Sequence, residues 1–213
     1  MTVEPCIGQT ARFSKAMDAC FACFDFQIAD QRTNAKGKSS LLTGLSGGPD
    51  STALALLAEQ YARQNNISHQ AVIVDHGARN DSAIEARRVA ERMQFFGINT
   101  VVRRVESAVP MRGLQSWARD HRYAILTSAA RELGAVLLLA HHEADQAETV
   151  FMRLSKGSGL GGLCGIAVAR RFSDILVLRP FLGWRPEDLL AVCNDFCCTF
   201  ESDPSNEDCS FER

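Results

Sequence analysis

The chain has 213 residues, 46% of them hydrophobic, and a formal net charge of −2 at pH 7. This length and composition predict one α/β domain with a substantial core, and the near-neutral charge argues against a domain that binds nucleic acid through bulk charge. Its apolar runs fall short of the roughly 20 residues that cross a bilayer. Because the N-terminus lacks a signal-peptide pattern, we expect a cytoplasmic protein without membrane contacts.

Strands and helices alternate along the chain after a first predicted helix over 10–26 and a polar linker over 30–40. Apolar runs predict strands over 41–45, 68–75, 99–105, 135–140 and 175–179. Helical periodicity predicts helices over 51–64, 82–96, 115–133, 143–155 and 185–196. Ser82 and Glu85 have the spacing of a capping box at the start of the helix over 82–96.

Strands that are apolar on both faces and alternate with helices indicate an α/β fold, a doubly wound and mostly parallel sheet with helices on both faces. Ligands in such folds bind at the carboxyl ends of the strands. Polar segments follow three of the predicted strands in this way: residues 46–51, the pair Asp75-His76, and the pair His141-His142. We therefore expect these segments to converge on one edge of the sheet.

The segment after the first strand reads Ser46-Gly47-Gly48-Pro49-Asp50-Ser51. Its glycines allow backbone N–H groups to converge on an anion, and the N-terminus of the following helix adds its positive dipole end. A phosphate chain is the expected ligand, and an ordinary strand-to-helix connection is the alternative. A Walker A loop is excluded, because Gly37-Lys38-Ser39 is preceded by Arg32 where that loop needs its first glycine.

A second polar segment, over 141–149, begins with two histidines. On a continuous helix, His141, Asp145 and Glu148 share one face. Such a face can bind a divalent metal, orient an ammonium group or accept a proton. The alternative is a capped and solvated helix start, where acidic residues are common. The position at a strand's carboxyl end favours the functional interpretation.

The remaining signals are less specific. The eight cysteines are expected to be reduced thiols, and Cys20 and Cys23 are predicted to lie on a buried helix face rather than to bind zinc. Arginines gather between residues 85 and 131, which fits either a phosphate-contact surface or solvated helix faces. A glycine pattern at 157–162 follows a helix instead of a strand, so we interpret it as a substrate-contacting loop and not as a dinucleotide site.

Taken in order, five segments resemble the tRNA(Ile)-lysidine synthetase family of the PP-loop superfamily: residues 46–51, 74–85, 118–123, 141–163 and 179–206. Ala78 and Lys156 stand where leucine and arginine are commoner in the family, and both keep the general character. The resemblance implies an adenine nucleotide alpha hydrolase-like fold, with an N-terminal helix and linker at 1–39 and a PP-loop catalytic domain at 40–213. The C-terminal tRNA-binding domains of the family are expected to be absent from this chain.

The resemblance implies an enzyme that uses ATP and Mg²⁺ to attach free L-lysine to C2 of the wobble cytidine in the isoleucine tRNA with a CAU anticodon. ATP would adenylate the C2 oxygen with loss of pyrophosphate, and the lysine amine would then displace AMP. The alternatives are a PP-loop tRNA thiolase of the 2-thiocytidine type, a small-molecule amidating enzyme, and a non-catalytic nucleotide-binding domain. The oligomeric state stays open, with a homodimer as one option.

Site residues follow from the resemblance by position. ATP binding would fall to Ser46, Gly47, Gly48, Pro49, Asp50, Ser51, Asp75 and His76, and Asp50 would also hold the Mg²⁺. The catalytic residues would be Asp50, Asp145, Glu148 and a histidine, His141 or His142, with the acids of the 141–149 segment binding lysine or removing its proton. Contacts to tRNA would come from Arg79, Arg119, Arg122, Lys156, Gly157 and Gly159.

Overall fold

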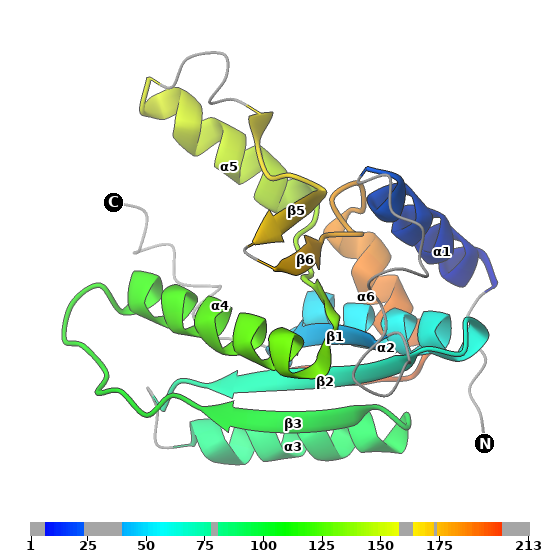
Figure 1. Cartoon of the computed structure of the whole chain (residues 1–213), viewed down its shortest axis with the longest axis horizontal. Coiled ribbons are helices and arrows are strands. Elements are labelled where there is room, and N and C mark those ends of the chain that lie inside the picture. Colours follow the sequence, from blue (N-terminus) through cyan, green and yellow to red (C-terminus); the bar gives the residue numbers. More distant parts are fainter. Residues whose placement is uncertain (1–6, 24–39, 78–80, 158–163, 173, 202–213) are drawn as a thin grey trace.

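A mostly parallel sheet with helices on both faces forms the centre of the molecule (Figure 1). The computed structural model describes residues 7–23, 40–77, 81–157, 164–172 and 174–201. Within these ranges the strands are β1 Ser40–Leu45, β2 Ser68–Asp75, β3 Asn99–Arg104, β4 Val136–Leu138, β5 Ala169–Phe172 and β6 Ile175–Leu178. The helices are α1 Ile7–Ala22, α2 Pro49–Gln64, α3 Ser82–Phe95, α4 Leu114–Leu133, α5 Glu143–Ser155 and α6 Pro186–Asp195.

The strand order determines which of the polar segments that follow the strands are neighbours. The strands pair in the order β3-β2-β1-β4-β6-β5, and all pairs are parallel except β5 with β6. The chain moves outward from β1 through β2 to β3 and then returns to the other side of β1 for β4. Such a reversal is the switch point at which open α/β sheets bind ligands. The segments that follow β1 and β4 are therefore neighbours, and the predicted fold class is confirmed.

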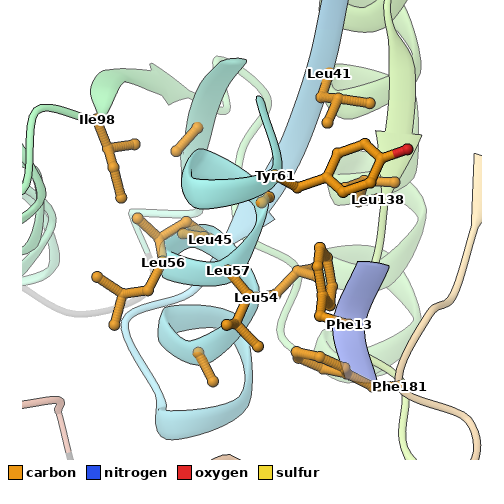
Figure 2. Packing of buried hydrophobic residues seen from close by; sticks show 14 of the residues in the cluster. Phe13, Leu41, Leu45, Leu54, Leu56, Leu57, Tyr61, Ile98, Leu138 and Phe181 are labelled. Atoms are coloured by element: carbon orange, nitrogen blue, oxygen red, sulfur yellow. The ribbon is translucent and has the colours of Figure 1, made fainter. Parts of the chain in front are cut away.

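Alternation along the strands divides the core into two layers. Leu41 and Leu45 of β1 pack with residues of α1, α2, α3 and α6, whereas Leu42 packs with α4 on the opposite face. Figure 2 shows the first layer, in which Phe13 of α1 contacts both Tyr61 and Phe181. The ring centroids of Phe13 lie 6.2 Å from Tyr61 and 5.7 Å from Phe181. Helix α1 is thus part of the main core.

Several sequence expectations on individual elements are wrong. Strand β5 was not expected, because Arg170 and Arg171 interrupt any apolar run, and both side chains are exposed at the edge of the sheet. Strand β3 is not apolar on both faces, since it pairs with β2 alone and carries three exposed residues at its end. The predicted capping box is not formed: Asp81 is the N-cap of α3, and the Ser82 hydroxyl donates to Asp75 Oδ1 at 2.7 Å.

The cysteine prediction holds for one residue of the pair. Cys20 is 1% exposed in the core, but Cys23 lies on the surface just past the end of α1. Burial raises the pKa of the Cys20 thiol to about 12, which keeps it protonated and unreactive. The predicted helix extended to Phe26, but α1 ends at Ala22, and residues 24–26 lie outside the described ranges.

Helix α5 stands apart from the layered core (Figure 1). Within the described chain, none of its residues is buried, and Phe151, Met152 and Leu154 are 72%, 45% and 54% exposed. Its first turn lies at the carboxyl edge of the sheet, next to the segment that follows β4. The helix therefore extends outward from the carboxyl edge of the sheet. No helix in the part of the chain described here has the length and apolarity to cross a membrane.

Candidate functional site

The glycine-rich turn, residues 46–51, connects β1 to α2 at the switch point. Gly47 has φ +93°, a left-handed value that glycine adopts without steric cost. The Ser51 hydroxyl accepts a hydrogen bond from the Ser46 N–H at 3.1 Å and donates to the Gly48 carbonyl at 3.1 Å. The Ser46 and Ser51 hydroxyls lie 3.0 Å apart. Both serines therefore brace the turn from within.

The N-terminus of α2 is open to a ligand. Gly48 is its N-cap and Pro49 its first residue, and no side chain of the described residues caps it. The N–H groups of Asp50 and Ser51 in this first turn have no partner within the helix. With the positive end of the helix dipole they form a site suited to an anion. A Cβ placed on Gly48 would meet only Ser46 Oγ, at 3.8 Å, so the surface above Gly48 is open.

Asp50, His142 and Asp145 come together across the switch point. His142 Nε2 lies 3.5 Å from Asp50 Oδ2, and His142 Nδ1 lies 3.5 Å from Asp145 Oδ2. His142 is the N-cap of α5. Its ring Nδ1 accepts a hydrogen bond from the Ala144 backbone N–H at 3.2 Å, and the His142 backbone N–H donates to Asp145 Oδ2 at 2.8 Å. Because Nδ1 accepts, the proton of the neutral ring lies on Nε2, facing Asp50.

Electrostatics distinguish Asp50 from an ordinary surface carboxylate. Burial raises the pKa of Asp50, and the nearby charge of Asp145 raises it further, while His142 opposes both effects. A carboxylate that carries this cost is well placed to bind a cation, because the cation would offset both burial and repulsion. The arrangement places negative charge from two chain segments beside the open N-terminus of α2.

His141 lies outside helix α5, so the predicted helical face shared by His141, Asp145 and Glu148 is wrong. The helix begins at Glu143, because the Asp145 carboxylate caps the preceding backbone. Glu148 lies one turn further along and is exposed. The structure thus places Asp145, and not Glu148, next to Asp50 and His142.

His141 is a neutral, half-buried residue beside Arg179. Burial lowers its pKa to about 4, and Arg179 is the next cause. Among the described residues, no group bonds to His141 Nδ1 or to Arg179 Nε. Arg179 is 7% exposed, and its guanidinium donates to the Ala167 carbonyl at 2.9 Å and to Tyr123 Oη at 3.4 Å. The charge of Arg119 also lowers the pKa of His141, which places α4 close to this part of the site.

The second predicted pair, Asp75 and His76, has two different roles. Asp75 Oδ1 accepts from the Gly77 N–H at 2.9 Å and from Ser82, so this carboxylate holds the turn after β2. Both ring nitrogens of His76 are buried, and no described residue bonds to them. Burial lowers the pKa of His76, with Arg122 as the second cause. A buried ring with unused nitrogens can accept or donate a hydrogen bond to a ligand.

The comparisons with known proteins agree with this geometry. A family model described as the PP-loop domain matches residues 24–213, which is most of the chain. The chain belongs to the PP-loop domain family.

This PP-loop domain is similar to curated bacterial proteins. It is 41% identical over 173 residues to a tRNA(Ile)-lysidine synthase of Novosphingobium aromaticivorans, covering 79% of this chain and 52% of that protein. It is 39% identical over 181 residues to a tRNA(Ile)-lysidine synthase of Bradyrhizobium diazoefficiens, covering 84% of this chain and 50% of that protein. The chain spans about half the length of these relatives.

The PP-loop domain also has a structural neighbour among solved structures. It matches a U34-tRNA thiolase of Methanococcus maripaludis with a TM-score of 0.69 at 16% identity, covering 91% of this chain and 67% of that chain. At that identity the likeness concerns the fold alone.

The donors of this PP-loop domain fit a metal held together with a ligand better than a metal held by protein alone. No three His, Cys, Asp or Glu side chains in the described ranges lie close enough together to hold an ion by themselves. Magnesium is commonly bound by one or two carboxylates together with substrate phosphates and water. Asp50, at the mouth of the turn, matches that partial site.

The predicted tRNA contacts are spread widely in the PP-loop domain. Arg119 and Arg122 lie on α4 near His141 and His76, respectively. Lys156 and Gly157 follow the last residue of α5, and at 1.5 Å per residue Lys156 lies roughly 16 Å from Asp145 along the helix. Arg79 and Gly159 fall outside the described residues.

Two contacts at the back of the turn were not predicted from the sequence. Cys193 of α6 is buried and donates through Sγ to the Pro49 carbonyl at 3.4 Å. Burial raises the pKa of its thiol to about 12, so the donor proton is retained. Glu201 donates its backbone N–H to the Gly47 carbonyl at 2.9 Å. Glu201 lies in the segment 179–206 that carries the family resemblance, but no local pattern indicates its contact with Gly47 or that of Cys193 with Pro49.

Acid is expected to destabilise the PP-loop domain through His141. Its pKa is about 4 in the folded chain and 6.5 in the absence of the fold. Between these values the unfolded chain binds a proton that the folded chain does not, so stability falls as the pH falls. We expect this residue to remove roughly 3 kcal/mol of the free energy of unfolding between pH 7 and pH 4. Urea denaturation across this range, with His141→Gln beside the parent, checks the effect; parallel pH profiles for the two proteins would contradict it.

Proposed function

We propose that this PP-loop domain carries out the ATP-dependent attachment of L-lysine to C2 of the wobble cytidine in the isoleucine tRNA with a CAU anticodon. The observation that carries the proposal is the junction of the open α2 N-terminus with Asp50, His142 and Asp145. Phosphate binding and cation binding meet there at one edge of the sheet. The names of the curated relatives support the choice of tRNA and of lysidine formation.

The first step is an adenylation. The C2 oxygen of the cytidine attacks the α-phosphorus of ATP, and the bond to the α,β-bridging oxygen breaks. Pyrophosphate leaves with its new charge directed at the N–H groups of the turn and of the first turn of α2. Bound Mg²⁺ supplies further neutralisation of the phosphates. Asp50 is the side chain that would hold it, because its carboxylate lies at the start of α2 and is destabilised by burial and by Asp145.

The second step is a substitution. The amine of lysine attacks C2, the bond from C2 to the adenylate oxygen breaks, and AMP leaves with the electron pair. The amine must lose a proton before this attack. Asp145 is the carboxylate that would bind the ammonium group of lysine and accept that proton. The exposed Glu148 on the same helix would extend the negative surface for the incoming cation. Neutral His141 could contribute a hydrogen bond but no positive charge.

Single-stranded loops are the part of RNA that proteins read most readily, because their bases can be turned out of the stack. Arg119 and Arg122 of α4 lie near His141 and His76, and Lys156 follows the last residue of α5. Cations at these places could contact the phosphates of such a loop. The proposal therefore assigns α4 and the end of α5 to tRNA and the turn to ATP.

The test is a lysine-incorporation assay. The protein is incubated with ATP, Mg²⁺, radiolabelled lysine and a saturating transcript of the isoleucine tRNA with a CAU anticodon. We expect label to enter the tRNA, with AMP and pyrophosphate released in equal amounts. The same transcript with uridine in place of the wobble cytidine serves as the matched control and should take up no label. The Novosphingobium aromaticivorans relative provides the positive control.

Three outcomes would contradict the proposal. Pyrophosphate release that does not need tRNA would indicate a small-molecule amidating enzyme. Nucleotide binding without any pyrophosphate release would indicate a non-catalytic domain. Protein-bound iron together with sulfur incorporation would indicate a thiolase, although burial of Cys20 and its raised pKa make it a poor cluster ligand.

A further inference from the structure

The carbonyl of Gly47 is held from the back of the turn. It accepts the Glu201 N–H at 2.9 Å and lies 3.4 Å from the Thr52 hydroxyl. A trans peptide unit is planar, with its C=O and its N–H pointing in opposite directions. Fixing the Gly47 carbonyl on the Glu201 side of the turn therefore directs the Gly48 N–H to the opposite side of the turn. The contact from Glu201 thus sets the direction of a candidate phosphate donor.

Glu201 is in turn held by α3. Its carboxylate accepts a hydrogen bond from Arg92 Nη2 at 2.6 Å. Val89 lies three residues before Arg92 on the same helix, and its Cγ2 would lie 2.8 Å from a Cβ added to Gly47. Glu201 Cγ would lie 3.5 Å from that Cβ. Helix α3 therefore supports Gly47 twice, by Val89 directly and by Arg92 through Glu201.

Arg92 also neutralises the negative charge of Glu201. The Glu201 side chain lies beside a turn suited to phosphate, with its Cγ 3.5 Å from where a Cβ of Gly47 would be, and an uncompensated negative charge on that side chain would repel a nucleotide. Arg92 offsets that charge, with side-chain exposures of 21% for Arg92 and 41% for Glu201. The other terminal guanidinium nitrogen of Arg92, Nη1, is buried, and no described residue forms a hydrogen bond with it.

We propose that Arg92 and Glu201 act as positioning residues for the phosphates of the nucleotide: Glu201 orients the Gly47–Gly48 peptide, and Arg92 holds Glu201 and neutralises it. The inference rests on the proposed use of ATP, but not on tRNA or lysine. The competing view is a surface ion pair, which adds little to stability and nothing to ligand binding.

The test measures nucleotide binding to the purified protein with two probes. α,β-Methylene ATP carries the phosphates that the turn would hold, and AMP lacks the two that leave. For Arg92→Ala we expect roughly tenfold weaker binding of α,β-methylene ATP, as for the loss of a charge-assisted contact, and binding of AMP within about twofold of the parent. Arg88→Ala, which removes an exposed arginine one turn earlier on α3, is the matched control and should change neither.

Glu201→Gln separates the charge from the backbone contact. This variant keeps the N–H on Gly47 and removes the carboxylate, so it should bind α,β-methylene ATP within about threefold of the parent. The double variant Arg92→Ala/Glu201→Gln should bind more tightly than Arg92→Ala alone, because no unpaired carboxylate remains. Equal affinities of Arg92→Ala and the double variant, or parent-like binding by Arg92→Ala, would overturn the proposal.

Melting temperatures and AMP affinity exclude loss of fold as the cause. A variant that loses AMP and α,β-methylene ATP binding to the same degree has a general defect, which would also count against a positioning role. Because the assay contains neither tRNA nor lysine, its result does not depend on lysine attachment. Failure of the incorporation assay together with the expected binding pattern would leave the positioning role standing and reject only the assigned substrate.

Discussion

Replacing Asp50 with asparagine is expected to reduce tRNA-dependent pyrophosphate release by roughly 100-fold or more without lowering the stability of the fold. The side chain keeps its shape but loses the charge that would hold a cation at the phosphates. Burial and Asp145 both raise the pKa of Asp50, so the ionised group is a cost to the folded state. The free energy of unfolding should therefore stay level or rise. A pyrophosphate-release assay and a urea titration on the same preparation measure the two quantities.

The matched control for this variant is Glu91→Gln, which neutralises an exposed acid on α3. It should retain parent-like release of pyrophosphate. If Asp50→Asn turned over at the parent rate, the carboxylate would have no part in cation binding. If it instead lost stability along with activity, the lowered rate would not identify a role in the chemistry.

Gly47→Ala is expected to have the second largest effect, on stability and on nucleotide binding together. The residue has φ +93°, a region that is costly for alanine by about 1–3 kcal/mol. The new methyl would also lie 2.8 Å from Cγ2 of the buried Val89. The turn must shift to relieve this contact, and the shift would turn the Gly48 N–H away from the phosphates. Thermal melting and α,β-methylene ATP titration detect the two effects.

The neighbouring glycine provides the comparison. Gly48 has φ −69° and open space where a Cβ would lie, so Gly48→Ala should melt close to the parent. Any loss of nucleotide affinity in that variant would come from the methyl facing the ligand. A Gly47→Ala protein with parent-like melting and affinity would show that the left-handed conformation is not needed.

The sequence was informative wherever one segment carries its own signal. The turn at 46–51 predicted an anion site because glycines, hydroxyls and a helix start occur within six residues, and the structure places that turn at the start of α2. Buried strands such as β1 and β6 were predicted from predominantly apolar runs. The convergence of Asp50 and His142 followed from a general property of parallel sheets.

The sequence was uninformative where a contact joins distant segments through ordinary residue types. Strand β5 has exposed arginines in place of an apolar pattern, because it lies at the edge of the sheet. Ser82 has the spacing of a cap, but its hydroxyl donates to the Asp75 carboxylate and Asp81 is the N-cap. The ion pair between Arg92 and Glu201 could not be predicted, because it joins α3 to the end of the described chain and each residue taken alone is typical of a solvated surface.

The contact between Glu201 and Gly47 has a consequence for the order of folding. It joins the end of the described chain to the turn after the first strand, with the whole sheet and α6 in between. Contacts between residues so distant in sequence form late, since they require the intervening chain to be ordered first. During refolding from denaturant, core burial should therefore precede recovery of nucleotide affinity. The phosphate turn would reach its final conformation only when the protein is otherwise complete.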